Sequence, residues 1–211
     1  MLDFAFLLKT GIALFAIVNP FGCLPIFINA THNWPKAERN KTARIAGLTV
    51  FMILTLAAFF GDQALHFFGI GIPSFQVGGG ILVLLNAINM MYAKPSNQTS
   101  DEAAAMAERE VIAVFPISIP LLAGPGAIST IIIAAEASGG LIGHLSMVLP
   151  IFVVCLSVWL VLRLSSNIAL NLGTIGINII TRLMGLILTA MAVESIAKGL
   201  AGLFPKLFGA L

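Results

Sequence analysis

Six long apolar segments alternate with shorter polar ones along the 211-residue chain. A helix needs about 20 apolar residues to cross the hydrocarbon core of a bilayer. The segments that come close to this length or exceed it are Phe4–Ala30, Ala43–Gly61, Phe75–Ala93, Val111–Ala135, Leu145–Leu162 and Ile177–Ala197. The pattern therefore predicts an all-α membrane protein with six transmembrane helices.

One long polar stretch, residues 94–110, lies between the third and fourth spans. Its part from Ser100 onward combines a serine, acidic residues and alanines, which is typical of a short capped surface helix. This linker divides the chain near its midpoint. We expect one membrane domain with two halves of three spans each, residues 1–105 with most of the linker and residues 106–211.

The two halves align without a gap at an offset of 105 residues, which places Pro20 on Pro125 and Gly80 on Gly185. Because each half has an odd number of spans, the halves must have opposite orientations. The chain is therefore predicted to be a 3+3 inverted-topology repeat. Such repeats are common in secondary transporters, whose substrate site lies near the midplane between the repeats.

The first and fourth spans are each interrupted near the middle, by Asn19-Pro20-Phe21-Gly22 and by Ala123-Gly124-Pro125-Gly126. Proline removes a backbone donor and breaks a helix interior, but it suits the first position of a new helix. We therefore predict that these two helices are broken. Their second halves would begin at Pro20 and Pro125, with Asn19 and Gly124 as N-caps.

Both new helices would begin near the midplane and run toward opposite faces of the membrane. Their unpaired N–H groups and the positive ends of their dipoles would converge on the membrane centre. Such groups must find partners or line a cavity, and a substrate carboxylate is a suitable partner. The alternative is a pair of proline kinks whose freed backbone groups are satisfied by neighbouring helices.

Polar side chains inside the spans are candidates for binding or coupling. Asn86 lies deep in the third span, where it either bonds across helices or lines the solute path. Glu194 is equivalent to Asn89 and either couples transport to protons or extends to the interface. Arg182 lies near the inner end of its span and can extend to the interface in the same way. The candidates for coupling or gating are Glu194, Asn89, Ser118 and Arg182.

Composition and charge exclude several other classes. Only 9% of the residues are charged, against about 25% in soluble domains, and the mean hydropathy is +1.04. A net charge of +2 gives no basis for nucleic-acid binding. No metal-binding or nucleophile–base motif occurs, so we expect no enzyme activity, no metal and no cofactor.

Orientation follows from the distribution of lysine and arginine, which accumulate on the cytoplasmic side. The predicted inner side carries Lys36, Arg39, Lys41, Arg44, Lys94, Arg109, Arg163 and Arg182, and the outer side carries Lys9, Lys198 and Lys206. Both termini are therefore expected outside. The first apolar segment lacks a basic start and is too long for a signal peptide, so we expect it to be retained.

The motifs around the two breaks resemble those of the MarC family, which includes the SnatA-type transporters of small neutral amino acids. The matching segments are Val18-Asn19-Pro20-Phe21-Gly22, Leu121-Leu122-Ala123-Gly124-Pro125-Gly126-Ala127-Ile128-Ser129 and Thr181-Arg182-Leu183-Met184-Gly185. The resemblance covers nearly the full length. It implies six spans in a bacterial inner membrane and a carrier for glycine, alanine and similar solutes.

The inverted repeat with two broken helices predicts a secondary transporter, which we expect to be coupled to protons, and the resemblance implies that its substrates are small neutral amino acids. The predicted substrate-binding residues are Asn19, Pro20, Gly22, Asn86, Gly124, Pro125, Gly126 and Ser129. An aquaporin-like passive pore is one alternative, although Gly124 replaces the second of the two asparagines that such pores use. A non-transporting scaffold is the other, and it would have no polar cavity between the broken helices.

Overall fold

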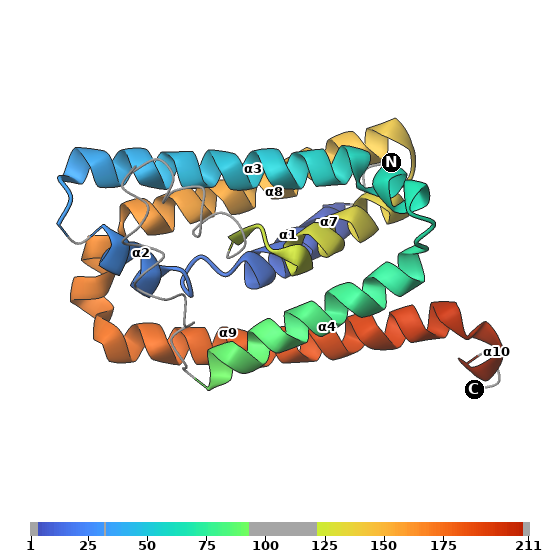
Figure 1. Ribbon diagram of the computed structural model, residues 1–211. Coiled ribbons are helices and arrows are strands. Elements are labelled where there is room, and N and C mark those ends of the chain that lie inside the picture. The colour runs from blue at the N-terminus through green and yellow to red at the C-terminus, as the bar shows by residue number, and fades with distance from the viewer. Residues whose placement is uncertain (1–3, 32, 93–121, 209–211) are drawn as a thin grey trace.

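The structure is a computed structural model that describes residues 4–31, 33–92 and 122–208, where every regular element is a helix (Figure 1). Four helical segments in these ranges are long and apolar enough to cross a membrane. They are α3 (Lys36–Phe67), α4 (Ile72–Met91), α8 (Gly140–Arg163) and Asn178–Leu203 of α9 (Ser165–Leu203). The predicted all-helical fold is confirmed for these residues.

The remaining helices are shorter. They are α1 (Phe4–Val18), α2 (Leu24–Ala30), α7 (Pro125–Ser138) and α10 (Pro205–Phe208). With 15 residues, α1 is only about 22 Å long at 1.5 Å per residue. The hydrocarbon core is about 30 Å thick, so α1 cannot cross it alone. The predicted first span is therefore two helices, α1 and α2, separated by a turn.

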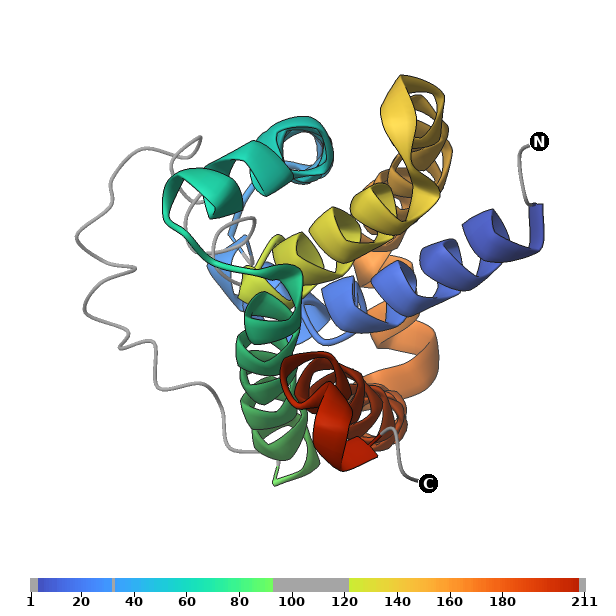
Figure 2. The same ribbon diagram turned by 90° about the vertical axis from the view of Figure 1, so that its right-hand side faces the viewer.

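The helices form three layers (Figures 1 and 2). In one outer layer α3 and α8 pack antiparallel, with the rings of Phe51 and Phe152 6.3 Å apart between centroids. In the other outer layer α4 packs along α9. The half-helices α1 and α7 lie between these pairs, where Leu14 and Ile131 are fully buried. The two breaks therefore lie in the central layer.

Glycines bring α4 and α9 into close contact. A Cβ atom placed on Gly80 would lie 3.2 Å from the carbonyl oxygen of Ala192, and one placed on Gly185 would lie 3.1 Å from that of Ala87. These two contacts are related by the offset of 105 residues, because Gly80 aligns with Gly185 and Ala87 with Ala192. Side chains longer than hydrogen would separate the helices at both points.

Three predicted spans, the second, fifth and sixth, are shorter than the helices that contain them, and the difference is largest for α3 and α9. The polar turns from Lys36 to Thr42 extend α3 before the apolar segment, because hydropathy marks the membrane-crossing part of a helix and not its full length. Similarly, α9 begins at Ser165 and not near Ile177. Its two parts meet at a kink at Gly173, whose φ of 59° falls in the left-handed region that glycine tolerates. The linker at 94–110 and the fourth span before residue 122 lie outside the described residues.

Candidate functional site

The break in the first span begins at Asn19, which has a φ of 45°. Its backbone N–H donates to the carbonyl of Phe15 at 2.9 Å, so Asn19 closes the last turn of α1. The next helix, α2, begins at Leu24 with Cys23 as its N-cap. The prediction that Asn19 caps a helix starting at Pro20 is therefore wrong. Asn19 ends the first helix instead, since asparagine is one of the few residues that adopt positive φ readily.

The side chain of Asn19 holds this turn in place. Its Oδ1 accepts a hydrogen bond from the backbone N–H of Gly22 at 3.3 Å. Its Nδ2 donates to the sulfur of Met90, 3.5 Å away on α4. A Cβ atom on Gly22 would overlap the Asn19 amide, so the turn requires glycine there. Asn19 thus connects the break to the C-terminal half of α4.

The start of the second half-helix in the fourth span agrees with the prediction. Gly124 is the N-cap of α7, with φ of −70° and ψ of 172°, and Pro125 occupies the first turn. Gly124 has no side chain that could accept the hydrogen bonds of the first turn. The N–H groups of Gly126 and Ala127 are among those that an α-helix leaves without a partner in its own backbone. The N-terminus of α7 therefore presents donors to whatever lies in front of it.

A cavity of about 290 Å³ lies in front of the α7 N-terminus. One wall is the start of α7, and the facing wall is the C-terminal half of α4, which contributes Asn86 and Asn89. The lining residues are Ile17, Leu82, Val83, Leu85, Asn86, Asn89, Leu122, Gly124, Pro125, Gly126 and Ala127. The structure thus brings together five predicted site residues from two distant segments in this cavity, the smaller of two. They are Asn86, Asn89, Gly124, Pro125 and Gly126.

A larger cavity of about 380 Å³ lies beside the N-terminal half of α4, between α1, α7 and α9. Ser129 lines it, and its hydroxyl donates to the carbonyl of Gly126 at 3.0 Å. The Thr130 hydroxyl donates to the same carbonyl at 2.8 Å. A Cβ atom on Gly79 would overlap the Ser129 side chain, so α4 and α7 are in direct contact here.

Charged residues line the larger cavity. Lys198 Nζ donates to Glu194 Oε1 at 2.6 Å, one helical turn away on α9, and both side chains are exposed. Lys9 of α1 also lines this cavity. Glu194, which was predicted to act in coupling, therefore lines the larger cavity and forms an ion pair with Lys198.

Ile17 and Val83 line both cavities. Both side chains are buried, at 8% and 7% exposure. Sequence reasoning missed these two residues, because an isoleucine or a valine inside an apolar run carries no signal that separates it from ordinary packing residues.

Four of the predicted site residues in the described ranges lie outside both cavities. Asn19, Pro20 and Gly22 form the turn between α1 and α2, and Arg182 is exposed on α9. The structure therefore does not bring the first break into the same cavity as the second. Ser118 lies outside the described residues.

Four apolar helical segments long enough to cross a bilayer, with half-helices packed between them, define a multi-pass integral membrane protein. A family model described as MarC family integral membrane protein matches residues 4–204. The chain therefore belongs to the MarC family.

Several curated relatives are similar over almost their whole length. UPF0056 membrane protein YhcE of Escherichia coli (strain K12) is 41% identical over 97% of this chain and 96% of its own. UPF0056 membrane protein YvbG of Bacillus subtilis (strain 168) is 38% identical over 97% of this chain and 98% of its own. UPF0056 membrane protein MJ1677 of Methanocaldococcus jannaschii is 38% identical over 95% of this chain and 98% of its own. No solved structure matches the chain.

Proposed function

We propose that the protein is a secondary transporter of small neutral amino acids, of the glycine and alanine class, in a bacterial inner membrane, and that it is not an enzyme. The observation that supports this proposal most directly is the smaller cavity, in front of the N-terminus of α7. Its opposite walls offer the two kinds of group that an amino acid zwitterion needs, and the rest of its lining is apolar. Binding pockets commonly combine an apolar lining with a few placed polar groups.

The N-terminus of α7 provides the site for the carboxylate. The N–H groups of Gly126 and Ala127 and the helix dipole both favour a negative charge at this position. Because Gly126 has no side chain, Val83 packs directly against the first turn of α7. The amide oxygens of Asn86 and Asn89 provide acceptors for the ammonium group from the facing wall.

The size of the cavity favours small solutes. About 290 Å³ lies just below the range of roughly 300–1,000 Å³ for ligand pockets. The side chains of Leu82, Leu85 and Leu122 occupy the remaining wall. Among the described residues that line this cavity none is charged, which favours neutral amino acids over acidic or basic ones.

An inverted repeat accounts for the paired contacts between α4 and α9. A two-fold relation between the halves requires that each contact recur with its partners exchanged. The contact of Gly80 with Ala192 recurs as that of Gly185 with Ala87. We propose on this basis that the six-span 3+3 architecture holds, and inverted repeats are widespread among secondary transporters.

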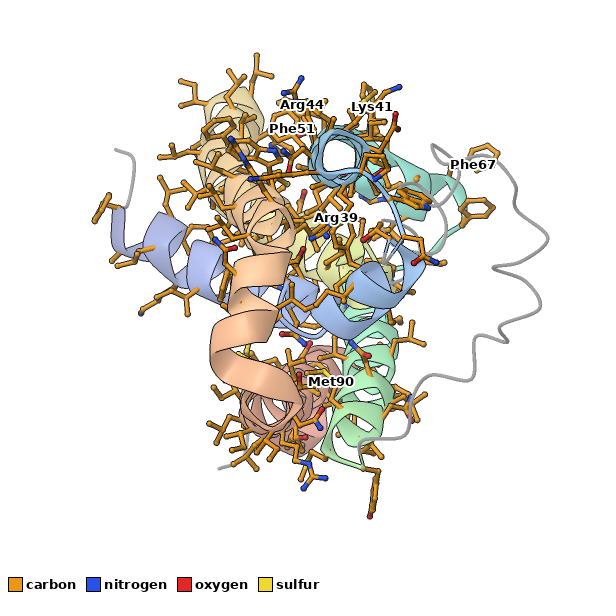
Figure 3. The ribbon with its side chains drawn as sticks, turned by 90° about the vertical axis from the view of Figure 1, so that its left-hand side faces the viewer. Arg39, Lys41, Arg44, Phe51, Phe67 and Met90 are labelled. Carbon is orange, nitrogen blue, oxygen red and sulfur yellow. The ribbon has the colours of Figure 1, made fainter. Side chains whose placement is uncertain are left out.

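The charges support an orientation with both termini outside. Arg39, Lys41 and Arg44 gather near the start of α3 (Figure 3). Arg163 ends α8, with its guanidinium 5.0 Å from the centroid of the Trp159 ring. Because α3 and α8 are antiparallel, these residues lie at one end of the bundle, which is then cytoplasmic by the positive-inside rule. The start of α1 and helix α10 lie at the other end (Figure 1).

Counterflow in proteoliposomes tests the proposal. Vesicles loaded with unlabelled alanine should accumulate labelled alanine or glycine, and excess unlabelled glycine but not glutamate or lysine should compete. Absence of exchange for every small neutral amino acid, in protein shown to be folded, would contradict the proposal. A passive pore would instead raise the water or glycerol permeability of the vesicles, and a scaffold would do neither.

A further inference from the structure

The two cavities follow one another along α4. The larger one reaches from Gln76 to Val83, and the smaller one from Leu82 to Asn89. Since α4 is a membrane-crossing helix, this order places the cavities at different depths in the bilayer. They meet at the residues that line both, Ile17 and Val83.

A third residue completes the boundary. A methyl group added to Gly126 would overlap Cγ2 of Val83 and would lie 3.4 Å from Cγ2 of Ile17. Side chains from α1 and α4 therefore meet at the backbone of Gly126 at the start of α7. The contact consists of apolar atoms.

We propose that Ile17, Val83 and Gly126 form a gate that separates a cavity open to one face of the membrane from a cavity open to the other. The gate rests on the proposed function in that it acts on a solute path through the protein. Apolar constrictions of this kind block water and ions when closed.

The surroundings of the gate allow it to open. Only van der Waals contacts join the three residues, and these weaken steeply when surfaces separate by 0.5–1 Å, as a general property of dispersion forces. Both half-helices reach the gate at their ends, since α1 ends at Val18 and α7 begins at Pro125. Each can therefore shift without bending a continuous transmembrane helix. The Asn19 turn follows directly and provides a joint between α1 and α2.

Cysteine labelling tests whether the cavities open to opposite faces. Cys23 and Cys155 are buried and are replaced by alanine to give a background without cysteine. Single cysteines are then introduced as Ala137→Cys in the larger cavity and Asn89→Cys in the smaller one. A small membrane-impermeant thiol reagent is added to right-side-out or to inverted vesicles. The proposal expects the two positions to react from opposite faces, and reaction of both from the same face would overturn it.

Substitutions in the gate itself provide the second part of this labelling experiment. Val83→Ala removes the atoms that touch Gly126, so both cysteines should then react from both faces. Val153→Ala is the matched control, because Val153 is exposed on α8, and it should leave the sidedness intact. Sidedness unchanged in Val83→Ala would overturn the gate. Gly126→Ala should tighten the contact and slow alanine exchange without abolishing sidedness.

The outcomes separate the gate from the choice of substrate. If labelling is sided and Val83→Ala abolishes the sidedness while the unmodified protein exchanges no amino acid, the gate stands and the amino acid proposal fails. If alanine exchanges but labelling is not sided, the amino acid proposal stands and the gate fails. Val83→Ala only removes atoms, so it remains informative if Gly126→Ala fails to fold.

Discussion

Gly80 of α4 and Gly185 of α9 make the same contact with the opposite helix, each against the backbone of an alanine, Ala192 and Ala87 respectively. The helices cross antiparallel, so the two contacts lie on either side of the crossing point. Val83 and Leu188, which also align at the 105-residue offset, are buried between them. This crossing is the observation that supports the proposal of two inverted halves, in which α4 and α9 would be equivalent.

Leucine at either glycine should destabilise the protein. A Cβ atom on Gly80 would lie 2.7 Å from Cγ1 of Ile196, and one on Gly185 would lie 3.1 Å from Cγ of Met91. We expect Gly80→Leu and Gly185→Leu each to cost about 1–3 kcal/mol, as overpacking does in general. Thermal unfolding in detergent measures the loss.

Gly78→Leu is the matched control for these variants. A Cβ atom on Gly78 would meet no heavy atom within 4 Å in the described part of the chain. Its effect should stay within about 0.5 kcal/mol, as for exposed positions in general. Equal destabilisation by Gly78→Leu and Gly80→Leu would show that the close helix contact is not the cause.

Gly79 should be coupled to Ser129. A methyl group at Gly79 would overlap both Cβ and Oγ of Ser129, so Gly79→Ala should lower the unfolding temperature. Ser129→Gly removes both atoms and should restore part of the loss in the double variant. A double-mutant cycle should give a coupling free energy of about 0.5–3 kcal/mol, as for residues in contact. Additive effects of the two changes would contradict the contact.

The backbone of Asn19 should matter apart from its side chain. Asn19→Ala and Asn19→Gly both lose the bonds to Gly22 and Met90, but only glycine adopts a φ of 45° without strain. We expect Asn19→Ala to be less stable than Asn19→Gly by about 1–2 kcal/mol, the cost of a left-handed residue with a Cβ atom. Equal stabilities in the same detergent would show that the turn relaxes.

Most of the helical framework could be predicted from the apolar pattern. The predicted third and fifth spans agree with α4 and α8 to within five residues at each end. Helix ends outside the apolar segments could not be predicted in this way. The first turns of α3 are polar and extend beyond the membrane-crossing segment, so hydropathy gives no sign of them.

The two breaks show where sequence reasoning reached its limit at the site. A proline predicts an interruption, but not whether the preceding residue ends one helix or begins the next. Gly124 begins a helix, whereas Asn19 ends one. The smaller cavity could be predicted in part, because Asn86 and Gly124 are unusual inside apolar spans. Ile17 and Val83 could not, since only the packing of three helices distinguishes them.

Asn86 should contribute to substrate affinity. If its amide accepts a hydrogen bond from the ammonium group, Asn86→Ala should raise the KM for alanine counterflow about tenfold, which corresponds to about 1.4 kcal/mol. Asn178→Ala is the control, because Asn178 is exposed on α9 and lines neither cavity. A KM that is unchanged in Asn86→Ala, or raised equally in both variants, would remove Asn86 from the binding site.

Glu194 should carry the coupling proton. It lines the larger cavity and is exposed there, so a proton can reach it from water, and its partner Lys198 lies 2.6 Å away. Glutamine keeps the shape of the side chain but cannot bind or release a proton. We therefore expect Glu194→Gln to abolish alanine uptake driven by a pH gradient while counterflow, which needs no net proton movement, continues.

Glu136→Gln is the control for the coupling experiment, because Glu136 is exposed on α7 but lines neither cavity. It should leave both gradient-driven uptake and counterflow unchanged. If Glu194→Gln also retains gradient-driven uptake, the carboxylate is an interfacial group that is paired with Lys198, and the proton must bind elsewhere. If both activities are lost together in folded Glu194→Gln protein, Glu194 acts in the transport step itself and not in coupling. The pair of assays therefore assigns Glu194 to one role, because proton coupling and solute movement are measured separately on the same vesicles.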